Sequence, residues 1–489
     1  MRILITSPEA VPYVKTGGLG DVTGNLAIQL AQSGHEVVLA LPYYKSIEFK
    51  PKKLKKAIYT LQVSMGDTEL SCAVWEKKSD ENLTVLFVEN DFYFDRSPIY
   101  DDGTDAYDDN GARFAFFSKA SLDLCIELKF QPNIALCNDW QTALIPYYIK
   151  SWGWNSDYFK KTASILVIHN LGYQGLTDSS YCKFIGLNWM QMREDEFEAL
   201  GAINLLKGGI FYADEIITVS PSYANEILSE PGGHGLSRYL MRRKDDLQGI
   251  INGIDTTEWN PKTDQLIPQT YDSKNLQGKE DCKLELQKQF LLHTNKRVPV
   301  FGFVGRLAYQ KGLDILRECI DEILSWNLQI VLLGSGDTEL ADFFYELPKR
   351  YPGKVGSYVG FNSELAHLIE AGSDFFLMPS YYEPCGLNQM YSMLYGTLPI
   401  VHATGGLNDS VQNFDPQKES GTGFQFDDMT PDALKNTIGW ALDTWFNQKA
   451  HYKKMQKRAM NQDFSWERPI KEYIRVFNQA IDRNRSWSY

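Results

Sequence analysis

Residues 1–42 read MRILITSPEAVPYVKTGGLGDVTGNLAIQLAQSGHEVVLALP and contain two short apolar runs around a glycine-rich and an amphipathic stretch. The pattern predicts a strand at Ile3–Thr6, a helix at Asp21–Ser33 that ends at Gly34, and a second strand at Glu36–Leu41. Such a strand–helix–strand unit is typical of a parallel sheet that helices cover on both faces.

The same alternation continues through the first half of the chain and starts again in the second half. Amphipathic stretches, such as a helix expected at Asn110–Leu128, separate apolar runs that have the length of buried strands. Further strands are expected at Leu83–Val88, Ile134–Cys137, Ile165–Ile168, Glu215–Val219, Val298–Val304, Gln329–Leu333, Gly356–Val359, Phe375–Met378 and Pro399–Val401. The sequence therefore predicts an α/β fold with two doubly wound, Rossmann-like domains.

The two halves are separated by a polar stretch at residues 255–297. We expect an N-terminal domain at residues 1–248 and a C-terminal domain at residues 249–462. A hinge is expected near Gly249–Asp255, followed by an irregular lead-in to the second domain.

The last residues, 463–489, form a separate feature. They contain the amphipathic stretch Glu467–Trp487, which predicts a helix. We expect this helix to pack back on the N-terminal domain.

Composition argues against several classes of protein. The chain has 489 residues, of which 49 are Lys or Arg and 62 are Asp or Glu, so its formal net charge is −13. A protein that follows a nucleic-acid backbone needs a basic face, so no nucleic-acid partner is expected. No apolar run approaches the ~20 residues of a membrane-spanning helix, and the N-terminal apolar run is too short for a signal peptide. The seven cysteines are scattered without a CxxC pair, which argues against disulfides or zinc and favours a cytoplasmic location.

Polar residues follow the expected strands in the first half. Lys15–Asp21 follows the first strand, and its glycines would let backbone N–H groups approach an anion at a helix start. Asp139 follows the Ile134–Cys137 strand, and His169-Asn170 follows the next strand along the chain. A glycine-rich turn or a single histidine is often only structural, but the carboxyl ends of parallel strands are where such folds bind ligands.

The second half repeats this arrangement. Arg306 and Lys311 follow a strand, and two cations at this spacing suit a diphosphate, although they could also be solvated surface residues. Glu383 follows the apolar run Phe375–Ser380 and precedes Pro384, which favours an extended backbone at Glu383. Thr404-Gly405-Gly406 resembles a further anion-binding helix start. A cluster of this kind in both halves is hard to explain by packing alone.

A nicotinamide enzyme is disfavoured. Gly18, Gly20 and Gly24 run G-x-G-x-x-x-G, which departs from the dinucleotide fingerprint. The second strand ends in Ala40-Leu41-Pro42 and has no acid to hold a ribose.

These residues together carry a resemblance to the bacterial glycogen synthases and plant starch synthases. The motifs are KTGGLGD at 15–21, NDW at 138–140, HNLGYQG at 169–175, LKGGI at 206–210, NGID at 252–255, RLAYQKG at 306–312, EPCGL at 383–387 and TGGL at 404–407. The resemblance runs from residue 1 to about Trp466. It implies the GT-B fold, two Rossmann-like domains facing a central cleft, and a retaining transfer of glucose from ADP-glucose to the 4-hydroxyl of an α-1,4-glucan.

The resemblance also implies roles for matching residues. Glu383 would bind the donor glucose or support the cationic transition state, Arg306 and Lys311 would neutralise the diphosphate, and His169 would face the sugar. The implied substrate-binding residues are Lys15, Gly17, Gly18, Asp21, Asp139, Asn170, Asn252, Phe361, Cys385, Gly386, Leu387, Thr404, Gly405 and Gly406. Among them, Phe361 stands where the family has a tyrosine that stacks on the adenine.

The chain departs from the family pattern at several positions. Leu136 and Asn138 stand where the family often has histidines, and Gln141 follows Trp140. Ala202 stands in place of a family glutamine, and Tyr391 occupies the second position of the Glu-x7-Glu pair of related transferases, as is usual in this family.

No DxD sequence near a strand end and no His pair at ligand spacing is visible, so we expect no metal and no other cofactor. Two alternatives remain open. One is a synthase-like glucan-binding or priming protein with weak turnover. The other is a GT-B transferase that uses UDP-glucose or a small acceptor.

Overall fold

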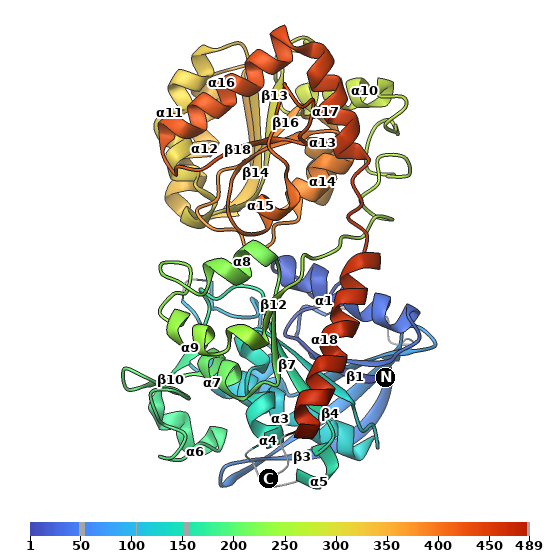
Figure 1. The fold of residues 1–489 in the computed structure, drawn as a ribbon, viewed down its shortest axis with the longest axis vertical. Coiled ribbons are helices and arrows are strands. Elements are labelled where there is room, and N and C mark those ends of the chain that lie inside the picture. The colour runs from blue at the N-terminus through green and yellow to red at the C-terminus, as the bar shows by residue number, and fades with distance from the viewer. Residues whose placement is uncertain (48–53, 104, 151–155, 487–489) are drawn as a thin grey trace. The chain divides into compact units, whose positions relative to one another are not determined.

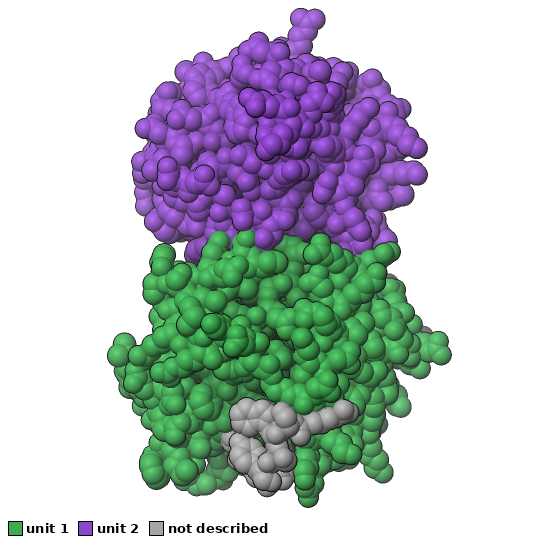
Figure 2. Space-filling view, viewed as in Figure 1, with its two compact units in different colours: residues 1–252, 466–489 green, residues 253–465 purple. Residues whose placement is uncertain are grey.

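The computed structural model describes residues 1–47, 54–103, 105–150 and 156–486. The chain divides into two compact units (Figure 2). Unit 1 comprises residues 1–252 together with the C-terminal residues from Trp466 onward, and unit 2 comprises Gly253–Ser465. Each unit is built around its own sheet (Figure 1).

Within the described residues, the main sheet of unit 1 has nine strands in the order β12-β11-β7-β6-β1-β2-β5-β4-β3. All neighbours from β12 to β5 are parallel, whereas β4 is antiparallel to both β5 and β3. The strands are β1 (Arg2–Thr6), β2 (Glu36–Pro42), β3 (Lys55–Met65), β4 (Thr68–Lys78), β5 (Leu83–Glu89), β6 (Ile134–Asn138), β7 (Ala163–Ile168), β11 (Glu215–Thr218) and β12 (Leu247–Gly249). A small antiparallel sheet has the order β8-β10-β9, with β8 at Leu176–Thr177, β9 at Glu198–Ala199 and β10 at Ala202–Asn204.

The helices of unit 1 cover its main sheet. They are α1 (Gly18–Gln32), α2 (Asp91–Phe94), α3 (Asn110–Glu127), α4 (Leu144–Lys150), α5 (Ser156–Phe159), α6 (Cys182–Ile185), α7 (Leu205–Tyr212), α8 (Pro221–Glu226), α9 (Ser237–Arg242) and α18 (Glu467–Ser486). The strands β1, β6 and β7 are almost fully buried, as expected for parallel strands between two helical layers.

Helix α18 packs against β7 and β11 of unit 1 (Figure 1). Arg483 pairs with Glu215 at 3.3 Å, and Asn484 Nδ2 donates to the Thr162 carbonyl at 3.1 Å. Trp487, which the sequence placed at the end of this helix, lies outside the described residues.

Unit 2 has a parallel sheet of six strands among its described residues, in the order β15-β14-β13-β16-β17-β18. These strands are β13 (Val300–Leu307), β14 (Gln329–Gly336), β15 (Val355–Val359), β16 (Phe375–Met378), β17 (Leu398–His402) and β18 (Phe424–Phe426). Its helices are α10 (Gln277–Gln289), α11 (Leu313–Ser325), α12 (Thr338–Arg350), α13 (Ser363–Gly372), α14 (Asn388–Leu394), α15 (Gly405–Ser410), α16 (Pro431–Asn447) and α17 (Lys449–Met460).

Two expectations about helices were wrong. Helix α1 begins at Gly18 and not at Asp21, so the glycines lie in its first turns. At Gly24 the lack of a side chain allows close packing, because a Cβ there would lie 2.4 Å from the Val11 carbonyl oxygen. The segment before the second sheet was expected to be irregular, but it contains helix α10. The buried Cys282 and Leu286 of this helix are surrounded by charged residues in the sequence, so no clear apolar pattern marks it.

In the part of the chain that the structure describes, no helix is long and apolar enough to cross a membrane.

Candidate active site

In unit 2, the strand order reverses between β13 and β16. From β13 the chain proceeds outward to β14 and β15, and from β16 it proceeds the other way to β17 and β18. The loops that follow β13 and β16 therefore meet at the carboxyl edge of the sheet, where doubly wound folds place their ligands. Arg306 lies inside β13, next to its last residue, and not after the strand as the sequence predicted. Lys311 lies in the loop after β13, and Glu383 lies in the loop after β16.

Lys311 and Glu383 form an ion pair in this position. Lys311 Nζ lies 2.5 Å from Glu383 Oε2, and the same oxygen accepts a hydrogen bond from Ser380 Oγ at 3.0 Å. The two side chains are only 19% and 9% exposed. A poorly solvated pair of this kind is strengthened by its low local dielectric, so both groups are held firmly.

Arg306 is connected to the same loops through Gln310. Arg306 Nη2 donates to Gln310 Oε1 at 3.1 Å, and Gln310 Nε2 donates to the Tyr382 carbonyl at 3.2 Å. The backbone N–H of Tyr381 in turn donates to the Gln310 carbonyl at 2.9 Å. Arg306 is exposed, so its guanidinium can reach a ligand while its backbone is fixed in β13. Sequence reasoning missed Gln310, although it lies inside the RLAYQKG motif.

The Thr404–Gly406 turn packs directly on the Glu383 loop. Gly405 has a φ of +45°, and a Cβ there would lie 2.1 Å from the Glu383 carbonyl oxygen. The N–H of Gly406 donates to this same carbonyl at 3.0 Å. One of the backbone donors that the sequence assigned to an anion is thus used to hold Glu383 in place. Thr404 stands at the N-cap of α15.

Helix α14 fixes the residues that follow Glu383. Gln389 Nε2 donates to the carbonyls of Cys385 and Gly386, each at 3.0 Å. Gly386 has a φ of +70°, and Leu387 is the N-cap of α14. The EPCGL motif is therefore a rigid turn that carries Glu383 at its first position.

Phe361 follows β15 and immediately precedes Asn362, the N-cap of α13. It belongs to the same carboxyl edge as the ion pair, and its side chain is 84% exposed. This exposure leaves the ring face accessible for stacking.

In unit 1, the strand order reverses between β1 and β6, and Asp139 directly follows β6. Its Oδ1 accepts the backbone N–H of His169 at 2.7 Å and that of Asn170 at 3.4 Å, which joins the ends of β6 and β7. Asp139 has a φ of +54°, which is a strained conformation for a residue with a side chain. Burial raises the pKa of Asp139 to about 7.

His169 is held by the residue that replaces a family histidine. Its Nε2 lies 2.9 Å from Asn138 Oδ1, and Asn138 Nδ2 donates to the Thr6 carbonyl at 3.0 Å. Because the amide oxygen accepts, this geometry favours the Nε2–H tautomer of His169. Burial lowers the pKa of His169 to about 3, so its imidazole is neutral near pH 7.

The KTGGLGD loop forms a second cluster in unit 1. Lys15 Nζ pairs with Asp21 Oδ2 at 2.7 Å, and Gly17 is the N-cap of α1, with Gly18 its first residue. Glu9, which the sequence did not single out, accepts hydrogen bonds from the Thr16 hydroxyl at 2.7 Å and the Tyr100 hydroxyl at 2.6 Å. Glu9 belongs to none of the motifs, so it could not be singled out from the sequence.

Asn252 ends the N-terminal segment of unit 1, residues 1–252. It is buried, and its Oδ1 has no hydrogen-bond partner within the described part of the chain.

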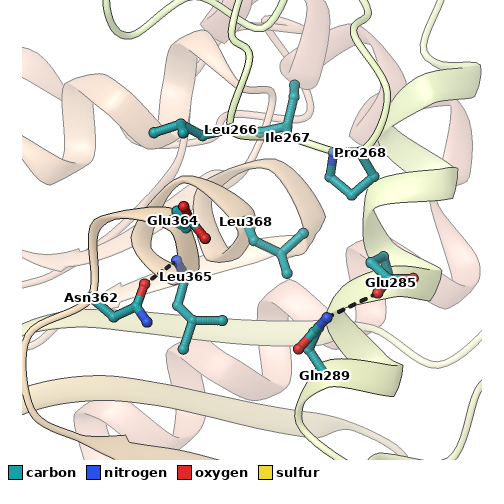
Figure 3. A pocket seen from close by; sticks show the side chains of 9 residues that line it. All are labelled: Leu266, Ile267, Pro268, Glu285, Gln289, Asn362, Glu364, Leu365 and Leu368. Atoms are coloured by element: carbon teal, nitrogen blue, oxygen red, sulfur yellow. Dashed lines mark hydrogen bonds between the residues drawn. The ribbon is translucent and has the colours of Figure 1, made fainter.

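A cavity of about 490 Å³ lies on another part of unit 2, between α10, α13 and the segment that precedes α10 (Figure 3). It is lined by Leu266, Ile267, Pro268, Glu285, Gln289, Asn362, Glu364, Leu365 and Leu368. None of these is a predicted site residue. Among the described residues, no group of three or more His, Cys, Asp or Glu side chains is arranged to hold a metal ion.

Comparison with known proteins decides the family. Residues 2–242 match the starch synthase catalytic domain, and residues 286–462 match glycosyl transferases group 1. Glycogen synthase 1 of Geobacter metallireducens is 41% identical over 98% of this chain and 96% of its own length. The glycogen synthase of Thermotoga maritima is 42% identical over 98% of this chain and 99% of its own length.

The chain belongs to the glycogen synthase and starch synthase family. Its fold is GT-B, and it is a glycosyltransferase. The solved catalytic domain of starch synthase IV from Arabidopsis thaliana, bound to ADP and acarbose, is 31% identical with a TM-score of 0.90, covering 98% of this chain and 99% of that one. Sucrose-phosphate synthase from Thermosynechococcus elongatus, at 18% identity and a TM-score of 0.62, shares the fold, with 98% of this chain and 99% of that chain covered.

Proposed function

We propose that this family member transfers glucose from ADP-glucose to the 4-hydroxyl at the non-reducing end of an α-1,4-glucan, with retention of the α configuration. The observation that carries the proposal is the Lys311–Glu383 ion pair at the carboxyl edge of the unit 2 sheet, with Arg306 anchored beside it through Gln310. The relatives named glycogen synthase and the starch synthase domain that holds ADP support the donor and the acceptor.

The leaving group of the proposed reaction is a negatively charged diphosphate, so positive charge near it favours the reaction. In the reaction, the bond between glucose C1 and the diphosphate oxygen breaks, and a bond from C1 to the acceptor O4 forms on the same face of the ring. The proton of the acceptor hydroxyl passes to the departing diphosphate, and ADP leaves. Arg306 can fork two phosphate oxygens and Lys311 supplies a point charge, so together they stabilise the departing ADP.

Glu383 serves the other side of the broken bond. Its carboxylate is held by Lys311 and by the Ser380 hydroxyl, and its backbone carbonyl is held by Gly406. A fixed carboxylate can bind sugar hydroxyls or stabilise the oxocarbenium-like charge that develops at C1. Phe361 offers its exposed ring to the adenine, and Cys385, Gly386, Leu387, Thr404 and Gly405 complete the turn around the phosphates and sugar.

In unit 1, we assign His169 as a neutral group that faces the sugar and Asp139 as the group that fixes its backbone. Lys15, Gly17, Gly18, Asp21, Asn170 and Asn252 are assigned to substrate binding on the same grounds of motif and placement. All seven cysteines, each within the described ranges, are free, and we place the activity in the cytoplasm.

A donor comparison tests this proposal. The chain is incubated with glycogen and either ADP-glucose or UDP-glucose, with and without EDTA, while nucleoside diphosphate release and incorporation of labelled glucose into glycogen are both measured. We expect release and incorporation to match, ADP-glucose to be the better donor, and EDTA to leave the rate unchanged. Binding of glycogen without turnover would favour a glucan-binding or priming protein, and preference for UDP-glucose would overturn the assignment.

A further inference from the structure

Unit 2 begins with residues 253–276, which precede α10 and are here called the strap. It is more than a linker, because Ile267 and Tyr271 are buried in a small hydrophobic cluster with Cys282, Ala371 and Tyr395. The strap therefore packs on α13 and α14, the two helices that carry Ala371 and lead to Tyr395.

Trp259 of the strap is stacked between these two helices. Its ring lies parallel to that of His367 on α13, with centroids 3.9 Å apart and an angle of 12° between planes. On its other face lies Tyr391 of α14, with centroids 4.0 Å apart and an angle of 10°. The indole thus acts as a flat spacer of fixed thickness between α13 and α14.

Hydrogen bonds hold the stacked rings in position. Asp264 Oδ2 accepts from His367 Nδ1 at 2.7 Å and from the Tyr395 hydroxyl at 2.5 Å. Tyr271 donates its hydroxyl to the Tyr395 carbonyl at 2.8 Å. Since Asp264 and His367 are almost fully buried, these bonds are shielded from water and hold the ring of His367 in one orientation.

The two helices are the supports of two loops of the donor site. Helix α13 begins right after Phe361, with Asn362 Oδ1 capping the N–H of Leu365 at 2.9 Å. Helix α14 begins right after the EPCGL motif, and its Gln389 fixes the carbonyls of Cys385 and Gly386. A change in the distance between α13 and α14 would therefore move Phe361 relative to Glu383.

We propose that Trp259 is a positioning residue for the donor, which sets the separation between the adenine-binding loop of Phe361 and the Glu383 loop. This inference rests on the proposed function, because it assumes that one nucleotide sugar spans both loops. A donor that contacts both loops at once is bound and aligned best when the loops lie at the right separation, and a misplacement of about 1 Å can cost about 100-fold in rate.

The test compares Trp259→Leu with Trp259→Phe and with Trp445→Leu. Trp445 of α16 is 8% exposed and packs edge-on against Phe375 and Tyr452 in the main core of the same unit, whereas Trp259 is partly buried. Trp445→Leu therefore controls for the loss of an indole that packs at least as deeply but away from the two loops. For each folded protein, the dissociation constant of ADP is measured by titration calorimetry, the KM and kcat for ADP-glucose by ADP release, and the Tm by circular dichroism.

We expect Trp259→Leu to weaken ADP binding about tenfold and to raise the KM for ADP-glucose in proportion. Phe fills part of the gap and keeps a flat ring, so Trp259→Phe should weaken ADP binding about threefold. Trp445→Leu should lower Tm and leave ADP affinity and KM close to those of the unsubstituted chain.

Wild-type ADP affinity in both Trp259 variants would overturn the inference, and so would an equal loss in Trp445→Leu. If Trp259→Leu does not fold, Trp259→Phe is judged by the same criterion. Failure of the unsubstituted chain to bind ADP or to use ADP-glucose would count against the proposed function instead, so the two failures are distinguishable.

Discussion

The Lys311–Glu383 pair brings together two residues that lie far apart in the sequence, and each has a different task in the proposed reaction. Lys311 comes from the loop after β13, and Glu383 from the loop after β16. Their contact at 2.5 Å means that a donor diphosphate bound at Lys311 would place its glucose within reach of the Glu383 carboxylate. Substitutions at the two positions should therefore differ in their effects on kcat and on ADP affinity.

Lys311→Ala removes positive charge from the leaving group and should lower kcat by about 10²–10³-fold. The matched control is Arg317→Ala, since Arg317 is another cation of unit 2 but makes an exposed pair with Glu339 at 2.7 Å. The control should keep its full kcat, because exposed pairs contribute little. Steady-state kinetics with ADP-glucose, with folding checked by circular dichroism, measure both. A folded Lys311→Ala protein with normal turnover would remove Lys311 from the site.

Glu383→Gln keeps the size and hydrogen-bonding reach of the side chain but removes its charge. If the carboxylate stabilises charge at C1, kcat should fall steeply while ADP affinity changes little, because the lost interaction belongs to the transition state. If the side chain only positions the sugar, Gln should retain much of the rate whereas Ala should not. Both variants are compared by kcat and by ADP titration. A Glu383→Ala protein with normal Tm and normal kcat would contradict either role.

His169 should stay neutral across the physiological pH range. Burial lowers its pKa to about 3, from an ordinary value of 6.5. In the ¹³C-edited NMR spectrum of the imidazole signals, the His169 resonance should not shift between pH 8 and pH 5. His169→Gln identifies the signal among the seven histidines of the chain.

The lowered pKa of His169 also determines how the unfolding free energy depends on pH. The unfolded chain takes up a proton at His169 below about pH 6.5 and the folded chain does not, so this group contributes stability above that pH and loses it as pH falls toward 3. The unfolding free energy of the unsubstituted chain should fall more steeply between pH 6.5 and 5 than that of His169→Gln. A His169 signal that titrates near pH 6.5 would show that the ring is solvated.

The turn at the start of α15 positions Glu383 through backbone contact, and it allows only glycine. Gly405→Ala would add a Cβ 2.1 Å from the Glu383 carbonyl oxygen at a φ of +45°. We expect a loss of about 1–3 kcal/mol in unfolding free energy and a fall in kcat, because the Glu383 loop must shift.

Gly439→Ala is the matched control for Gly405→Ala. Gly439 lies inside α16, where an added Cβ would meet only ordinary contacts with Trp326 at 3.8 Å. This substitution should raise stability by up to about 1 kcal/mol and leave kcat unchanged. Urea unfolding and steady-state kinetics of both proteins test the pair. Normal stability and kcat in Gly405→Ala would show that the turn tolerates a side chain.

Most parallel strands could be predicted, because buried strands are short apolar runs, but the three-residue edge strands β12 and β18 were missed. Phe375–Met378 is a strand with the predicted bounds, and most others differ by one to three residues at an end. The antiparallel pair β3 and β4 was missed, since half of its positions face solvent and no long apolar run marks it. The small sheet of β8, β9 and β10 was missed because its strands are only two or three residues long.

Most of the proposed site residues could be named from the sequence because they lie near the carboxyl ends of strands that the apolar runs predict, and their roles stay predictions. What could not be predicted is which of them touch. The Lys311–Glu383 contact joins residues from different strands, and the Gly406 N–H bond to Glu383 uses a donor that the motif had assigned to an anion. The role of Asn138 as the partner of His169 also depends on a contact between β6 and β7 that no local pattern reveals.

The main sheets of the two units share one topological feature. The strand order reverses between β1 and β6 in unit 1 and between β13 and β16 in unit 2. At each reversal the loops after two neighbouring strands carry charged or hydrogen-bonding side chains: Asp139 in unit 1, and Lys311 and Glu383 in unit 2. This repetition explains why the motifs of the family are distributed along the whole chain. It also means that the function must be judged on the intact protein.

The most direct measurement follows the transferred carbon. ADP-glucose labelled with ¹³C at C1 of its glucose is incubated with the intact chain and a maltooligosaccharide, and the C1 signal is followed by NMR while ADP is quantified. We expect the label to appear in an α-1,4 linkage at the non-reducing end, with one ADP formed for each glucose transferred. A β-linked product, or free glucose in place of a longer chain, would contradict the proposed transfer.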